Sequence, residues 1–61
     1  MTLKEAKKFF GISETDTIYA DGVKKILAHD EAVIRRGYPM SDVEVAKKSA
    51  EACRALLSVA V

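Results

Sequence analysis

The chain has 61 residues, of which 49% are hydrophobic, and its ten Lys and Arg against nine Asp and Glu give a formal net charge of +1. This apolar fraction excludes a disordered tail, and the balanced charge neither favours nor excludes nucleic acid as a partner. The uncharged run at residues 55–61 is far shorter than the roughly 20 apolar residues of a membrane span. We expect one cytoplasmic domain with no membrane partner.

Few devices are available to stabilise so small a core. A short chain buries a smaller fraction of its surface than a long one, so small domains add disulfides, a metal or a partner chain. Cys53 is the only cysteine, and His29, the only histidine, has no second ligand at a helical spacing. No internal disulfide, metal or cofactor is therefore predicted. Association with another chain is the remaining way to supplement the core.

The first predicted helix begins after Thr2, whose hydroxyl and the Glu5 carboxylate have the spacing of a capping box. Its apolar stripe comprises Leu3, Ala6 and Phe10. Gly11 is expected to end the helix in the left-handed conformation, with Ile12 as the apolar residue of a Schellman motif. A helix of two to three turns is not stable alone, so its stripe must pack on another element.

The second helix is predicted from about Asp16 to Arg36, with Gly22 as a local weak point. A start at Asp21-Gly22 is the alternative, which leaves residues 17–19 extended because β-branched and aromatic residues suit strands. A single strand would have no visible partner, and this favours the longer helix.

Asp30 interrupts the apolar side of this second helix. We expect either a break at residues 28–29, which Asp30 would cap, or a carboxylate at the exposed edge of the helix. Either interpretation is preferred to a buried, functional Asp30.

The third helix is predicted to begin at Ser41, with Ser41 and Glu44 as a capping box and with Met40 and Val45 as a hydrophobic staple. Gly37 closes the helix before it. Mostly small residues form its apolar side, which allows close approach of another helix. They are Ala46, Ser49, Ala50, Cys53, Leu56, Leu57 and Ala60. Three such helices with short links predict an all-α fold, a compact three-helix bundle, in which residues 1–61 form a single helical domain.

A protein partner is predicted for the third helix, because the first two helices are expected to cover only part of its apolar side. The predicted interaction residues are Ala46, Ala50, Cys53, Leu56, Leu57 and Val59. The chain lacks the P-loop, GxGxxG, HExxH and GxSxG motifs, and Cys53 lies in mid-stripe as a small core residue rather than as a nucleophile. The predicted function is a non-catalytic interaction module or adaptor, forming a homodimer or docking on a larger protein.

Nucleic acid is the alternative partner, and two observations point to it. Lys25, His29 and Arg36 share a strip of the second helix that suits an acidic partner or phosphates. Val33-Ile34-Arg35-Arg36-Gly37, followed by Val43, resembles a helix-turn-helix, and Thr2-Leu3-Lys4-Glu5-Ala6 with Phe10-Gly11-Ile12-Ser13 resembles the start of excisionase-type DNA-binding proteins. These resemblances imply a DNA-binding accessory protein, although Asp42 and Glu44 at the tip of the reading helix have the wrong charge to face phosphates.

A further resemblance is to J-domain-like co-chaperones. Phe10-Gly11-Ile12-Ser13-Glu14 looks like the end of that family's first helix, and Ala50-Glu51-Ala52-Cys53-Arg54-Ala55-Leu56-Leu57 looks like its third. Gly37-Tyr38-Pro39-Met40 stands near the place of the family's His-Pro-Asp signature and retains only the proline. The resemblance therefore implies a degenerate, partner-binding version of the module.

Overall fold

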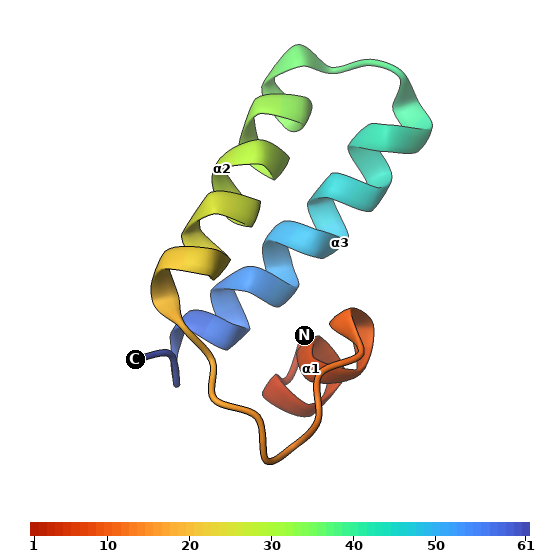
Figure 1. The fold of residues 1–61 in the computed structure, drawn as a ribbon. Helices are drawn as coiled ribbons and strands as arrows, with labels where there is room; N and C mark the ends of the chain where they lie inside the picture. The colour runs from red at the N-terminus through yellow and green to blue at the C-terminus, as the bar shows by residue number, and fades with distance from the viewer.

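The computed structural model describes all 61 residues and contains three helices, α1 (Leu3–Phe10), α2 (Ala20–Arg36) and α3 (Met40–Leu57). Helices α2 and α3 form an antiparallel pair, and α1 packs near the C-terminal end of α3 (Figure 1). No Cα atom of α1 lies within 8 Å of one in α2, so α3 is the helix on which both others pack. The predicted all-α, three-helix bundle is confirmed. None of its helices combines the length and apolar character needed to cross a membrane.

Both ends of α1 form as the sequence predicts. The Glu5 amide donates to Thr2 Oγ1 at 3.2 Å and the Thr2 amide donates to Glu5 Oε1 at 3.0 Å, which completes the capping box. Hydrogen bonds from Thr2 lower the pKa of the Glu5 carboxyl from its ordinary value of 4.5. Gly11 is left-handed at φ 68°, and the Ile12 amide donates to the Lys7 carbonyl at 2.8 Å in a Schellman motif.

The start of α2 differs from the prediction. The helix begins at Ala20 rather than near Asp16, and the preceding residues are extended. Their backbone has a partner, because the Val61 amide donates to the Ile18 carbonyl at 2.9 Å and the Ala20 amide donates to the Val61 carbonyl at 3.0 Å. The C-terminal residue thus supplies hydrogen bonds that a first helical turn would otherwise have made. The predicted longer helix is wrong for this reason.

Helix α2 is continuous through Gly22 and through residues 28–29, so the predicted break is wrong. Asp30 is also not at an exposed edge, since only 6% of the residue is accessible. It faces α3, where the Cys53 Sγ lies 4.0 Å from Asp30 Oδ2. The small side chains on that side of α3 leave room for a carboxylate between the two helices.

The start of α3 also departs from the prediction. Pro39, in an extended conformation at φ −66°, is the residue before the helix, and no side chain caps it. The amides of Asp42 and Val43 each donate to the Pro39 carbonyl at 3.1 Å, so Ser41 already lies inside the helix. The predicted capping box at Ser41 is therefore wrong. The predicted hydrophobic staple removes neither of its residues from solvent, because Met40 and Val45 are each 62% exposed.

The core lies where α1, the extended segment before α2, the first turns of α2 and the C-terminal half of α3 meet. It consists of Ala6, Ile18, Val23, Ala52, Cys53 and Leu56. Three of the six side chains, Ala6, Ala52 and Cys53, are small, so the core buries little apolar area per residue and the stability of the isolated chain depends on few contacts.

Replacing Val61 by Pro tests the contribution of the C-terminal pairing. The substitution removes the amide that donates to Ile18, so the free energy of unfolding is expected to fall by about 1 kcal/mol. Val61→Ala is the matched control, because it keeps the amide and shortens a side chain that is already 75% exposed. Chemical denaturation measures both variants, and equal stabilities would contradict a structural role for the pairing.

Candidate interaction site

The face of α3 that the sequence analysis assigns to a partner is mostly used within the chain. Ala46, Ala50, Cys53 and Leu56 are between 0% and 4% exposed. Helices α1 and α2 approach α3 and together enclose these small residues. Leu57 is half-buried, and Val59 is 47% exposed in the C-terminal segment. Any surface available to a partner therefore lies mainly elsewhere.

The open side of the bundle lies between α1 and α2, which do not pack on each other. A groove of about 730 Å³ occupies this side, with Cys53 and Leu56 of α3 at its inner end. Its walls are mostly apolar and come from the end of α1, the linker and the first turns of α2. The apolar wall residues are Phe10, Ile12, Ile18, Tyr19, Val23 and Ile26. Tyr19 is 66% exposed and Ile26 is 43% exposed, so two large side chains at the rim of the groove are accessible to solvent.

A second, more polar hollow of about 340 Å³ lies between the C-terminal half of α2 and the start of α3. Both hollows are lined by the same side of α2, because their α2 residues recur at three- and four-residue steps. We name this side the open face of α2. It comprises Tyr19, Gly22, Ile26, His29, Val33 and Arg36. Five of the six are exposed and Val33 is half-buried, so no other part of the chain covers this face.

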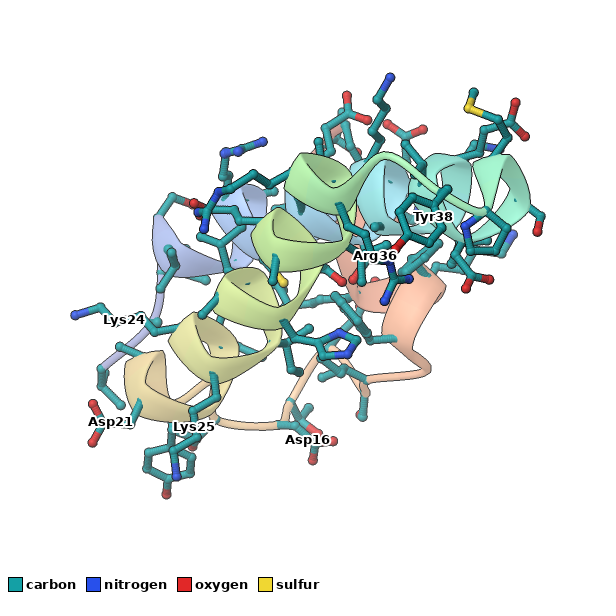
Figure 2. All side chains as sticks on the ribbon, turned by 90° about the horizontal axis from the view of Figure 1, so that it is seen from above. Asp16, Asp21, Lys24, Lys25, Arg36 and Tyr38 are labelled. Atoms are coloured by element: carbon teal, nitrogen blue, oxygen red, sulfur yellow. The ribbon has the colours of Figure 1, made fainter.

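Charged side chains of both signs lie near the two ends of this face (Figure 2). Asp16, Asp21 and Lys25 gather at the N-terminal end of α2, whereas Arg36 lies at the other end beside Tyr38. The predicted strip of Lys25, His29 and Arg36 is exposed along its whole length. Two of its members, His29 and Arg36, line the second, more polar hollow.

Arg36 is held at the tip of the α2–α3 hairpin by several contacts. Its Nε donates to the Tyr38 carbonyl at 2.7 Å, its guanidinium lies 5.4 Å from the centre of the Tyr38 ring, and Nη2 is 3.8 Å from Asp42 Oδ2. The exposed ion pair contributes little to stability. The stacking and the backbone bond orient the guanidinium, and 45% of the Arg36 side chain stays accessible.

In the interior the Cys53 Sγ donates to Asp30 Oδ2 at 4.0 Å, and the side chain of the buried Ser49 also forms a hydrogen bond with Cys53. Burial raises the pKa of the Cys53 thiol above its ordinary value of 9.0, and the Asp30 charge acts in the same direction. A thiol with a raised pKa is not activated as a nucleophile. No group of three or more His, Cys, Asp or Glu side chains could hold a metal ion.

The pKa of Cys53 predicts how stability changes at alkaline pH. Below pH 9.0 both the folded and the unfolded chain keep the thiol proton, but above it the unfolded chain releases the proton first, so stability falls. Cys53→Ala lacks this titration and loses a buried sulfur, which is expected to cost about 1 kcal/mol at neutral pH. The difference in the free energy of unfolding between the wild-type chain and Cys53→Ala, measured by denaturation, should therefore become smaller as the pH rises to about 10. A difference independent of pH would contradict the raised pKa.

Gly22 lies in the first turn of α2, and a Cβ built there would meet nothing within 4 Å. Gly22→Ala is therefore expected to stabilise the chain by about 0.5 kcal/mol, because it lowers the conformational entropy of the unfolded state without a clash. Gly37→Ala is the matched control and should destabilise by about 1 kcal/mol, since Gly37 is left-handed at φ 80°. Thermal denaturation compares the two. Loss of stability in Gly22→Ala would show that the site is not open.

Comparison of the chain with protein-family models, with curated proteins and with solved structures gives no match. The resemblances to J-domain-like co-chaperones and to excisionase-type proteins gain no support from these comparisons. On the surface of the chain, the mostly apolar groove beside the open face of α2 is the most extensive hollow.

Proposed function

We propose that this chain is a non-catalytic protein interaction module of the cytoplasm, which binds its partner along the groove beside the open face of α2. The observation that carries the proposal is that one of the three possible helix–helix contacts of the bundle, the one between α1 and α2, is absent. Helices α1 and α2 each pack on α3 and not on each other, and the gap between them is a mostly apolar groove. Buried apolar area is the main source of affinity in such an interface.

A helix is the element that fits this groove. Two helices that flank a third present a hydrophobic channel, and an amphipathic helix fills such a channel with residues at three- and four-residue steps. Tyr19 and Ile26 stand at its rim as candidate anchors. Tyrosine suits this role because it offers a large contact area with few rotatable bonds.

The J-domain-like alternative agrees with two helix boundaries. Helix α1 ends at Phe10, in the segment that resembles the end of the family's first helix, residues 50–57 belong to α3, and Pro39 lies in the link between α2 and α3. A degenerate co-chaperone module of this kind also acts by binding a protein. It is thus a narrower form of the same proposal.

The helix-turn-helix alternative has less support. In a helix-turn-helix the two helices cross at roughly 90–120°, whereas α2 and α3 lie antiparallel along their length (Figure 1). Val43, which would begin the reading helix, is 4% exposed. DNA binding then depends on the strip of Lys25, His29 and Arg36 alone, and it would weaken steeply as salt rises.

Site-specific cross-linking in the native cells tests the proposed function. Tyr19 is replaced by p-benzoyl-phenylalanine, and Lys47, exposed on the outer side of α3, is replaced in the same way as the control. Irradiation is expected to give a discrete protein adduct from position 19 and none from position 47. Adding Ile26→Glu should remove the adduct, since it places a charge on the groove rim.

Two outcomes would contradict this function. One is the absence of any protein adduct from position 19, and the other is an adduct that persists in the Ile26→Glu background. Ile26 is 43% exposed, so this substitution leaves the core in place and circular dichroism can verify that the helices remain.

A further inference from the structure

The hollow between the C-terminal half of α2 and the start of α3, called the polar hollow below, contains a charge without a counterion. Asp30 is only 6% exposed and lines this hollow of about 340 Å³. We propose that the polar hollow receives one cationic side chain, a lysine or an arginine, of the partner protein, which forms an ion pair with Asp30. This inference rests on the proposed function and adds a chemical requirement on the partner.

The Asp30 carboxylate has one weak partner within the chain. Its Oδ2 accepts from the Cys53 thiol at 4.0 Å, and its Oδ1 forms no hydrogen bond with another residue. No side-chain oxygen of the interior both lacks a hydrogen-bond partner and is sealed from solvent, so Oδ1 faces the hollow that Asp30 lines. A thiol is a weak donor without charge, whereas buried carboxylates are normally paired with a cation. The hollow is therefore the side from which a counterion can reach Asp30.

The cations near the polar hollow are paired elsewhere or lie on another side of α2. Arg36, at the rim, is 3.8 Å from Asp42 Oδ2, so the charges of these two residues offset each other. His29, also at the rim, forms no ion pair and carries no formal charge at pH 7. Lys25 lines neither hollow and lies about 140° around α2 from Asp30. One negative charge of the hollow is thus left uncompensated.

The walls of the polar hollow suit the carbon chain of a lysine or an arginine. Val33, Val45 and Ala46 give it apolar sides. Asp30 and Ala46 are its least exposed residues, so the carboxylate lies at the inner end. Lysine and arginine both pack an aliphatic stem against apolar surface and carry their charge at the tip. The volume also lies near the lower limit of the roughly 300–1,000 Å³ found for small-molecule pockets, which suits a single side chain.

The position of the polar hollow relative to the apolar groove specifies the partner further. Both are lined by the same side of α2, and Gly22 in the groove wall precedes Asp30 by eight residues, about 12 Å along the helix axis. A partner helix that lies along α2 with apolar residues in the groove therefore places its cation about two turns away from them.

A cation tethered within the chain tests the polar hollow on the purified protein. Val45 lines the hollow and is 62% exposed, so Val45→Lys brings an ammonium group to it. Val45→Gln is the matched control, because lysine and glutamine have similar helix propensities. The midpoint of thermal denaturation is expected to be higher in Val45→Lys than in Val45→Gln by about 4 °C or more. In an Asp30→Asn background this difference should fall to about 1 °C or less, since the exposed Asp42 contributes little.

Asp30→Asn alone distinguishes a binding group from a structural one. Asparagine has nearly the same shape and no charge, so the variant removes an uncompensated buried charge. Its midpoint of thermal denaturation should therefore equal or exceed that of the wild-type chain. A carboxylate that supports the fold would instead make the variant less stable or unfolded, and that result would overturn the inference.

Cross-linking from position 19 in the native cells tests whether the partner supplies the cation. Asp30→Asn is expected to reduce the yield of the adduct by roughly tenfold, because the partner loses its ion pair. Asp21→Asn is the matched control and should leave the yield unchanged, since Asp21 is an exposed carboxylate of the same helix that lines neither hollow.

Two further results would count against a cationic side chain of the partner. One is a stability difference between the Val45 variants that does not depend on Asp30. The other is an adduct from position 19 whose yield is the same with Asp30→Asn, and this result leaves the proposed function intact because the partner still contacts the groove. Absence of any adduct from position 19 contradicts the proposed function instead, while the Val45 variants still report on the hollow itself. The two proposals therefore fail under different results.

Discussion

The packing of both other helices on α3 is the interaction on which the rest of the structure depends. Seven of the eleven buried residues belong to α3, and they are mostly small. Small side chains let the backbones of α1 and α2 approach the backbone of α3 closely. Dispersion contacts between these closely packed helices take the place of the contacts that large side chains make in an ordinary core. Helix α1 has only eight residues and could not persist without this support. Because α1 and α2 both pack on α3 and not on each other, the side of the bundle between α1 and α2 is left open.

Local signals in the sequence predict well where the determining contacts are local. The capping box at Thr2 and the left-handed Gly11 involve residues within a few positions of each other, so the ends of α1 are predicted correctly. The same reasoning is wrong at Ser41, where the Pro39 carbonyl already accepts from two amides and the helix begins earlier. A local pattern permits a cap, but the preceding proline decides where the helix starts.

Contacts between distant residues explain the other differences. Nothing near Ile18 in the sequence indicates that the last residue of the chain will bond to its backbone, so the start of α2 could not be placed from pattern alone. Asp30 could not be placed either, because its burial depends on the size of the facing residues of α3. The predicted interaction residues on α3 form a real apolar face, but the structure uses four of them internally, and the groove combines segments whose proximity no periodicity reveals.

The pairing of Val61 with the segment before α2 joins the end of the chain to the wall of the groove. Ile18 and Tyr19 line that wall, and their backbone conformation is fixed partly by two hydrogen bonds to a single terminal residue. Val61 is 75% exposed and its two hydrogen bonds lie outside the helices, so this part of the wall opens more readily than the helix interiors. Affinity and local opening are then linked thermodynamically. A ligand that requires an ordered wall strengthens the attachment of Val61 to the segment before α2. Conversely, loosening Val61 weakens the binding of that ligand by the same free energy.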